Sequence, residues 1–295
     1  MTMVDITGAI DMHCHFGPDP RRPRSVDALQ LAREAMQAGQ RGAVLKSHDY
    51  PTAAIAALAQ SAVGGPLLFG SICCDEQVGG INPAAVEAAL RIDAKVVWMP
   101  THSSKVVDPG SAKLANAASV THAHANGEAG EIRLIDDDGG LLPATREVLA
   151  LIEEHGAIVA TGHTARDEHF AVTREFASRG QVIVTHARQA TCQPDLSVDD
   201  CVALADLGAV IEFSAITCLG VYACRPVEEI VDAIRAVGVD RCIVSTDFGQ
   251  EKNPHPTEGL QLMADALVAG GLEEKEVRRM MCDTPARLLG VDEAR

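Results

Sequence analysis

The sequence predicts a single (β/α)8 barrel, the architecture of the TIM barrel, and three observations support this fold. Eight short apolar segments alternate with amphipathic, alanine-rich segments along almost all of the 295 residues. Strands that alternate with helices predict a parallel sheet, and eight units in a chain of this length fit a closed barrel better than an open sheet. Aromatic residues make up only 3% of a chain that is 47% hydrophobic, so aliphatic side chains must fill the core, as they do in barrel interiors. We therefore expect one domain that spans residues 1–295.

Each expected strand is a short apolar run that ends in polar residues, and each expected helix carries apolar positions along one face. The strands are expected at residues 9–15, 42–48, 67–73, 95–101, 157–163, 181–186, 209–214 and 242–247. The helices are expected at residues 25–38, 83–92, 145–155, 167–178, 198–207, 227–237 and 257–269. Ser25 and Ser197 are the expected N-caps of two of them, because serine satisfies free amides at a helix start. Residues 105–142 break the rhythm and are expected to form an insertion after the fourth strand.

The composition excludes several classes of function. The formal net charge is −16 at pH 7, and such a field repels nucleic acids and anionic membrane surfaces. No basic and apolar leader opens the chain, and no apolar run approaches the roughly 18 residues that cross a bilayer. The nine cysteines form no CxxC pair, which favours buried, reduced thiols. We therefore expect a cytoplasmic protein, monomeric or homo-oligomeric, that acts on a small molecule.

Chemically active residues collect at the ends of the expected strands. Strand ends carry Asp11-Met-His-Cys-His15, Lys46-Ser-His48, Thr161-Gly-His163, Thr185-His186 and Ser245-Thr-Asp247. In such barrels the active site lies at the carboxyl ends of the strands. Residues two apart on a strand point the same way, so His13 and His15 are expected to grip one ion.

Imidazole and carboxylate groups suit Zn²⁺ and similar divalent ions, so we expect zinc, with manganese, iron and cobalt as alternatives. A lone HxH arises often by chance, and a single histidine at a strand end can be a hydrogen-bonded core residue. Suitable residues at five strand ends are far more specific, and together they predict a metal site. Asp247 is expected to serve as a ligand and as the general base for an attacking water.

The order of these residues resembles the amidohydrolase superfamily. The resemblance rests on HxH in the first strand, histidines after the fifth and sixth, and an aspartate after the eighth, here His13, His15, His163, His186 and Asp247. Residues 283–290, DTPARLLG, are similar to the ending of many such hydrolases. The segments LKSH (45–48), VWMPT (97–101) and ATGH (160–163) look like those of a little-characterised branch of metal-dependent hydrolases. The resemblance implies a metal-dependent hydrolase.

One departure leaves the number of ions open. Members with two ions usually place a bridging carboxylated lysine or glutamate on the fourth strand, where this chain has Trp98 or Pro100. Lys46 is the expected substitute, either carboxylated as a bridge or as an ammonium that binds a substrate carboxylate. His13, His15 and Asp247 would hold one ion, and His163 and His186 a second.

The remaining roles concern the substrate and the reaction. His186 is expected to polarise the substrate carbonyl, and His48, His102 and Arg188 to contact the substrate. Arginines after the first strand, Arg21, Arg22 and Arg24, could receive a carboxylate, while Glu212 could orient a ligand histidine.

The main functional hypothesis is hydrolysis of an amide, cyclic amide or lactone. The alternative is a decarboxylase or other lyase with one ion, favoured by the absent bridge on the fourth strand. A phosphoesterase, and a barrel that binds metal without catalysis, are the weaker alternatives.

Overall fold

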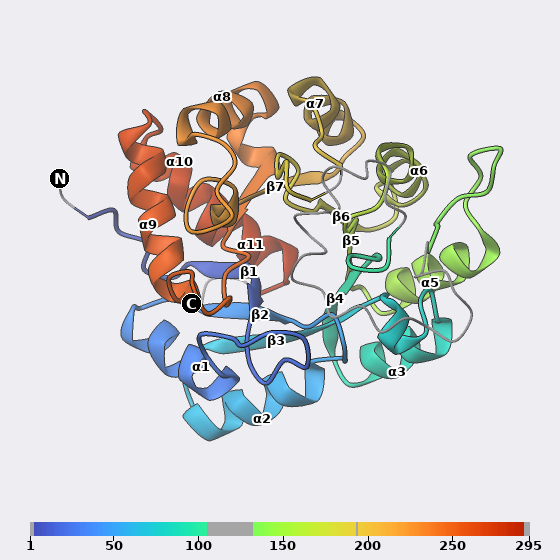
Figure 1. The fold of residues 1–295 in the computed structure, drawn as a ribbon, viewed down its shortest axis with the longest axis horizontal. Helices are drawn as coiled ribbons and strands as arrows, with labels where there is room; N and C mark the ends of the chain where they lie inside the picture. Colours follow the sequence, from blue (N-terminus) through green and yellow to red (C-terminus); the bar gives the residue numbers. More distant parts are fainter. Residues whose placement is uncertain (1–2, 105–131, 193, 292–295) are drawn as a thin grey trace.

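The computed structural model describes residues 3–104, 132–192 and 194–291. Eight parallel strands form one sheet in the order β1 to β8, and the helices lie around the outside of the strands (Figure 1). The strands are β1 (Ile10–His15), β2 (Gly42–Lys46), β3 (Leu67–Cys73), β4 (Ala94–Trp98), β5 (Ile158–Ala160), β6 (Gln181–Val184), β7 (Val210–Ser214) and β8 (Cys242–Ser245). The predicted (β/α)8 barrel is therefore confirmed. The expected strands extend up to three residues too far, because the polar residues at their ends leave the hydrogen-bond ladder.

The barrel closes where the chain after β8 meets β1. Cys14 forms a parallel bridge with Phe248, and the amide of Asp247 donates to the carbonyl of His13 at 2.7 Å. The amide of His15 donates to the carbonyl of Phe248 at the same distance. These bonds place the ends of β1 and β8, with His13, His15 and Asp247, next to one another.

Seven of the described helices follow the amphipathic pattern of the sequence, and α2, α10 and α11 were not expected. The helices are α1 (Ala28–Gln37), α2 (Ala53–Val63), α3 (Pro83–Arg91), α5 (Pro143–Glu154), α6 (Arg166–Phe176), α7 (Val198–Asp206), α8 (Val227–Val237), α9 (Pro256–Ala269), α10 (Glu274–Arg278) and α11 (Thr284–Leu288). Helix α2 was missed because its sequence, AAIAALAQSAV, has almost no polar face. Ser197 caps α7 as predicted, since its hydroxyl accepts from the amide of Asp200. The prediction for Ser25 is wrong, because Asp27 caps α1 instead.

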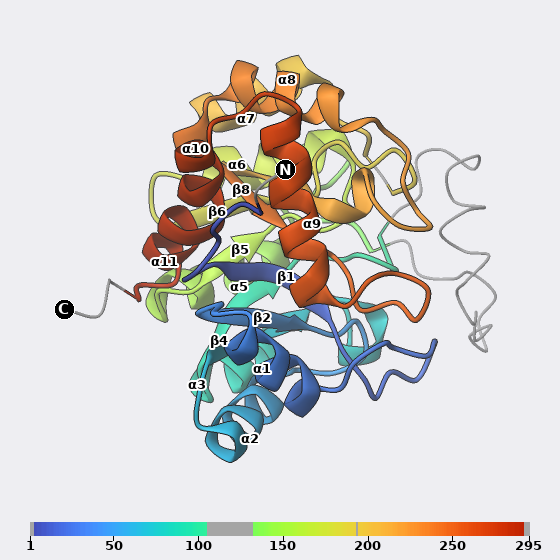
Figure 2. The same ribbon diagram turned by 90° about the vertical axis from the view of Figure 1, so that its left-hand side faces the viewer.

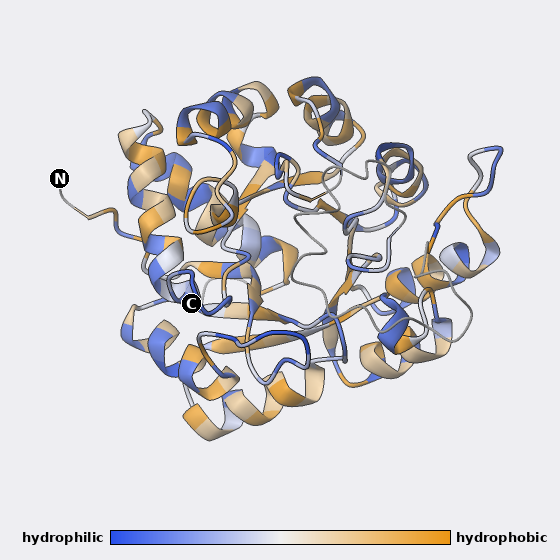
Figure 3. Ribbon diagram, in the orientation of Figure 1, coloured by the Kyte–Doolittle hydropathy of each residue, from blue (hydrophilic) through white to orange (hydrophobic). Residues whose placement is uncertain are grey.

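Apolar side chains fill the barrel and the layer between strands and helices. The strands are mostly in the colours of hydrophobic residues in Figure 3. Ile10, Met12 and Val44 lie in the interior cluster, and Leu288 and Leu289 from the C-terminal segment pack against the same cluster. Figure 2 shows α11 at one end of the barrel and the loop 16–27, in dark blue, at the other. The C-terminal segment therefore plugs the end of the barrel away from the candidate site.

The predicted insertion at 105–142 lies mostly outside the described residues, which resume at 132. From there the amide of Ile132 donates to the carbonyl of Ser103 at 2.9 Å. Ile135 and Leu141 pair in an antiparallel bridge around an acidic turn, and α5 begins directly after it. In the part of the chain that the structure describes, no helix is both long and apolar enough to span a membrane. All nine cysteines are free.

Candidate metal centre

A bulge in β1 aims both histidines of the HxH motif. The pairing of β1 with β2 shifts register between Asp11 and Cys14, and bulges of this kind redirect side chains near active sites. Met12 packs in the barrel interior, the ring of His13 lies tilted against that of Trp98 with 4.5 Å between centroids, and Cys14 lies in the outer layer. Asp11 fixes this bend.

The carboxylate of Asp11 ties the bend to the chain after β8. One oxygen accepts from the amides of His13 (3.1 Å) and Thr246 (3.0 Å), and the other accepts from the Thr246 hydroxyl at 2.5 Å. Burial raises the pKa of Asp11 to about 7, although the bonds from Thr246 oppose the rise. Asp11 thus holds the two segments that carry His13, His15 and Asp247.

His13, His15 and Asp247 form the first cluster. Oδ1 of Asp247 lies 3.2 Å from Nε2 of His13 and 3.0 Å from Nε2 of His15. The three side chains are almost completely buried, and their potential ligand atoms lie within 4.8 Å of one another. Burial opposes ionisation of Asp247, but the charge and hydrogen bond of His13 hold its pKa well below its usual range.

The environment of His15 leaves its Nε2 available to bind a cation. Burial, and then the charge of Arg24, lowers the pKa of His15 to about 3, so its ring is neutral at pH 7. Its Nδ1 lies 3.1 Å from the carbonyl oxygen of Lys46, which can only accept a hydrogen bond. The single ring proton therefore sits on Nδ1, and the lone pair of Nε2 faces the carboxylate of Asp247. Nε2 of His15 and Oδ1 of Asp247 each offer a lone pair, so a cation fits beside both atoms. Imidazole nitrogen and carboxylate oxygen are ligands that zinc binds.

Glu212, on β7, orients the other histidine of the motif. Its Oε1 lies 3.0 Å from Nδ1 of His13 and accepts from the Ser245 hydroxyl at 2.5 Å, while its Oε2 accepts from the amide of His186 at 2.8 Å. Burial opposes the charge of Glu212, but His13 outweighs it and lowers the pKa of Glu212 to about 2. Burial and the charge of Lys46 oppose protonation of His13, but Asp247 and Glu212 outweigh them and raise its pKa. Glu212 holds a proton on Nδ1 of His13, so that Nε2 would bind an ion after it releases its own proton, as in metal-binding histidines backed by a carboxylate.

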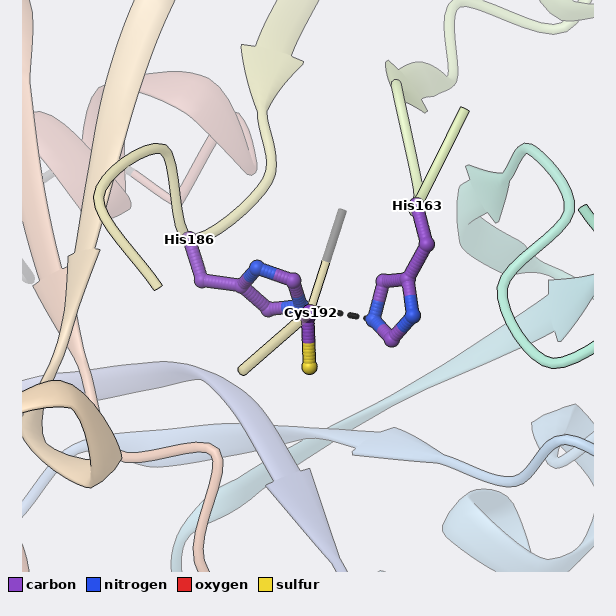
Figure 4. A group of neighbouring side chains, drawn as sticks. All are labelled: His163, His186 and Cys192. Atoms are coloured by element: carbon purple, nitrogen blue, oxygen red, sulfur yellow. Dashed lines mark hydrogen bonds between the residues drawn. The ribbon is translucent and has the colours of Figure 1, made fainter. Parts of the chain in front are cut away.

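His163, His186 and Cys192 form a second cluster on the neighbouring strands. Figure 4 shows the two imidazoles turned toward each other, with the side chain of Cys192 beside them. The two Nε2 atoms are 2.7 Å apart, and the potential ligand atoms of all three residues lie within 4.8 Å of one another. Burial lowers the pKa of His186 to about 4 and holds that of His163 well below its usual value, which favours neutral rings.

Lys46 and Trp98 occupy the floor between β2 and β4. The ammonium of Lys46 lies 3.0 Å from Nε2 of His13 and 4.2 Å from the centroid of the Trp98 ring. Trp98, one of the two residues expected near the bridging position of the fourth strand, is completely buried. An ammonium over an aromatic face is a favourable cation–π contact.

The rings of His48 and His102 lie tilted against each other with 3.9 Å between centroids, and both residues line the cavity. Nδ1 of His48 lies 2.5 Å from the Thr101 hydroxyl and 3.2 Å from Asp75. Asp75 also accepts from Thr101 and from the amide of Ser103. These hydrogen bonds satisfy the carboxylate of Asp75, which holds the segment that contains Thr101 and Ser103 against His48. Burial lowers the pKa of His102 to about 3.

The cavity over these residues has a volume of about 380 Å³. Its cationic wall comes from the arginines of the loop after β1. Arg24 forms an ion pair with Asp19 of the same loop, and Arg21 forms one with Asp49, which follows β2. Arg22 lines the cavity, and its Nε is buried without a partner among the described residues. The opposite wall is apolar and comprises Ile216, Val221, Tyr222 and Ala223.

The structure places most of the predicted site residues together. His15, Lys46, His48, His102, His163 and Asp247 line the cavity, while His13 and His186 contact them from beneath. Arg188 does not line it. Its guanidinium donates to the carbonyl of Leu196 at 2.6 Å and lies 3.9 Å from Asp195 and from Glu229. We therefore assign Arg188 no contact with a substrate.

Two residues depart from the sequence interpretation. Cys192 is among the cysteines expected to be buried, reduced thiols, yet it lines the cavity. The one signal for this position in the sequence is its place in a polar loop six residues after His186. His169 lies in a mostly polar segment, yet it is completely buried on α6, and neither ring nitrogen has a partner among the described residues. The helical pattern around it is polar, which hid its burial.

Solved structures of similar fold include several enzymes. The chain matches an amidohydrolase from Pseudomonas aeruginosa with a TM-score of 0.60 and 13% identity over 96% of this chain and 95% of that one. It matches a probable 2-pyrone-4,6-dicarboxylic acid hydrolase from Acinetobacter baumannii with a TM-score of 0.60 and 11% identity over 96% and 99%. It matches a 2,6-dihydroxybenzoate decarboxylase from Rhizobium with a TM-score of 0.59 and 13% identity over 96% and 98%.

These likenesses confirm the predicted resemblance to the amidohydrolase superfamily at the level of the fold. No curated protein matches the sequence. The model of DUF6282, a family of unknown function, matches residues 8–212, and the chain belongs to this family.

Proposed function

We propose that this protein is a metal-dependent hydrolase that cleaves an amide, cyclic amide or lactone in a small carboxylated molecule. One observation carries the proposal: Nε2 of His13 and Nε2 of His15 lie 3.2 and 3.0 Å from Oδ1 of Asp247 in a buried cluster. A divalent cation can bind to these three atoms, and both histidines come from the same strand. Zinc suits two imidazoles and a carboxylate, although manganese, iron and cobalt share such sites.

Asp247 is the residue that moves the proton. When bound, a divalent ion polarises a substrate carbonyl and acidifies the attacking water. Asp247 stays ionised at neutral pH, and its Oδ2 has no hydrogen-bond partner among the described residues. The carboxylate can accept the proton of the water through Oδ2 and return it to the leaving nitrogen or oxygen.

Lys46 stabilises the charge that develops on the carbonyl oxygen, and His186 acts on the same oxygen through an ion that it binds. The ammonium of Lys46 sits over Trp98 and beside His13, an environment suited to a cation. Metal binding at His13 would push this ammonium toward the cavity, where it can donate to an oxyanion or to a carboxylate. A carbamate on Lys46 that bridges two ions is the alternative role, and the mass of the intact protein distinguishes the two.

The cavity favours a small anionic substrate. Its volume of about 380 Å³ suits a small molecule, and the guanidinium of Arg22 lacks a carboxylate partner among the described residues. Two of the structural relatives are named for carboxylated compounds, a dicarboxylic acid and a dihydroxybenzoate. Replacing Arg22 by glutamine removes a charged hydrogen bond of about 1.5–3 kcal/mol, which corresponds to a roughly ten- to hundredfold rise in KM for carboxylated substrates.

The first experiment measures metal per chain, on protein purified without chelator, followed by a screen of carboxylated amides and lactones. Asp247→Asn should lower kcat at least about a hundredfold, the lower end of general acid–base contributions. Asp265→Asn is the control, because Asp265 binds the amide of Val4 far from the site. Protein that binds no metal after reconstitution, or Asp247→Asn protein that binds metal with unchanged turnover, contradicts the proposal.

A mononuclear decarboxylase is the second candidate, and Trp98 is the observation that favours it. The fourth strand carries this buried tryptophan near the expected bridging position. A mononuclear decarboxylase needs a site for one ion and a site for the substrate carboxylate. The first cluster would bind the ion, and Arg22 would bind the carboxylate. Release of carbon dioxide from a carboxylated aromatic acid, with no hydrolysis of amides or lactones, would replace the first proposal by this one.

A further inference from the structure

We propose that Cys192 is the third ligand of the second ion expected at His163 and His186, so that one thiolate and two imidazoles bind a zinc-like ion. This inference rests on the proposed function, because it adds a second ion beside the one at His13, His15 and Asp247. It assigns a ligand role to Cys192, which occupies no position of the histidine and aspartate pattern along the strands.

The backbone aims the two histidines at one point. His163 follows Gly162, which has a φ of +67°, and a side chain at Gly162 would overlap the carbonyl oxygens of Met99 and Pro100. His186 itself has a φ of +23°. These turns after β5 and β6 bring the two Nε2 atoms to 2.7 Å, with Cys192 on the loop that continues from His186 (Figure 4).

The distances require only a small adjustment to admit an ion. Tetrahedral zinc with Zn–N bonds of about 2.0–2.1 Å separates two nitrogen ligands by about 3.3 Å, and a Zn–S bond of about 2.3 Å places the sulfur about 3.6 Å from each. The nitrogens are 2.7 Å apart, and all three ligand atoms lie within 4.8 Å of one another. Shifts of about 1 Å or less, from side-chain rotation, therefore suffice.

Cys192 differs in its surroundings from the other eight cysteines. It is the only cysteine that lines the described cavity, whereas Cys14, Cys73, Cys74, Cys201, Cys242 and Cys282 are buried. The thiol of Cys224 already donates to Oε1 of Gln189 at 2.7 Å. On binding, the S–H bond of Cys192 breaks, its proton passes to solvent and the sulfur bonds to the ion, which suits zinc and cobalt.

The second site shares its space with the first. The ring of His186 lies 5.9 Å from that of His13 between centroids, in a stacked arrangement, and Asp247 and Cys192 line the same cavity. Two ions would then face one substrate without the usual bridge on the fourth strand.

Cobalt titration of the full-length apoprotein tests this inference, because a thiolate bound to Co²⁺ gives a charge-transfer absorption in the near ultraviolet that imidazoles and carboxylates do not. We expect wild type to bind two equivalents with this absorption. Cys192→Ser should lose the absorption and bind one equivalent, and Cys192→Ala, which offers no oxygen ligand, should behave in the same way. Cys224→Ser is the matched control and should keep both.

Each outcome separates this inference from the proposed function. Asp247→Asn should weaken the first ion and keep the thiolate absorption. Wild-type protein that binds cobalt without the absorption, or Cys192→Ala protein that retains it, overturns the second site while the first remains. Protein that binds no cobalt overturns both. Circular dichroism of each variant confirms that a lost ion does not reflect a lost fold.

Discussion

Replacing Glu212 by glutamine should weaken metal binding at His13 without removing any ligand. Glu212 accepts three hydrogen bonds, from His13, from Ser245 and from the amide of His186. Glutamine keeps the shape of the side chain but has one acceptor oxygen, and its amide group can only donate. At least one of the three donors then faces another donor, and the proton of His13 loses its charged partner.

The expected magnitude follows from the geometry. Loss of a carboxylate behind a metal-binding histidine typically costs ten- to a hundredfold in metal affinity, which is about 1.4–2.7 kcal/mol. The donor that loses its partner adds a desolvation cost of about 1–3 kcal/mol to the free energy of unfolding of the metal-free protein. We therefore expect both a lower affinity and a lower stability.

Competition with a chromophoric zinc chelator measures the affinity, and urea unfolding of the apoprotein measures the stability. Glu168→Gln is the matched control, because Glu168 is equally buried and accepts from the amides of Leu134 (2.7 Å) and Ala165 (2.8 Å), but contacts no predicted ligand. Both variants should lose stability, and only Glu212→Gln should lose affinity. Equal zinc affinities in the two variants would refute the role assigned to Glu212.

Three further predictions concern the fold. Leu288→Ala should lower the free energy of unfolding by about 2–5 kcal/mol, because it opens a cavity in the plug of the barrel; urea unfolding measures this, and a loss below about 1 kcal/mol would contradict the plug. Ser197→Ala should cost about 0.5–2 kcal/mol as a lost N-cap, whereas Ser25→Ala, which caps no helix, should cost less; equal losses by thermal unfolding would contradict the assignment. Burial, and then the charge of His186, lowers the pKa of His169 to about 3, so the unfolded chain binds a proton that the folded one does not. The neutral His169 contributes its full stability above about pH 6.5. Between that pH and about 3, the free energy of unfolding falls by about 1.4 kcal/mol for each unit by which the pH decreases. His169→Gln should flatten this slope between pH 7 and 5 relative to wild type and to His155→Gln, whose site is exposed; parallel slopes would contradict the burial of His169.

The sequence was sufficient to predict the order of strands and helices, because each strand is a short apolar run and most helices have one apolar face. It failed where that contrast disappears. Helix α2 is alanine-rich on nearly all sides, so periodicity could not reveal it. The N-cap of α1 was misplaced because Ser25 and Asp27 are both good caps, and only the packing of the loop that precedes α1 decides between them.

The candidate site could be predicted only as far as strand ends locate it. Residue types and their positions after β1, β5, β6 and β8 place the histidines and Asp247 at one end of the barrel. The loops that follow the strands set the remaining positions. Cys192 approaches the histidines, and Arg188 turns away from the cavity, through loop conformations that leave no periodic signal in the sequence.

The backbone at two predicted ligands gives independent support for the site. Among the described residues, only Asp93, His186 and Asp247 have a positive φ without being glycine, at +73°, +23° and +53°. This region costs a side-chain-bearing residue of the order of 1–2 kcal/mol, and such strain concentrates at functional sites. Asp93 lies in the turn between α3 and β4, where aspartate is well tolerated. His186 and Asp247 stand directly after β6 and β8, where a relaxed backbone would continue the strand and turn the side chain away. The fold therefore retains strain at two of the residues that the sequence assigns to metal, which a purely structural role for His186 and Asp247 would not require.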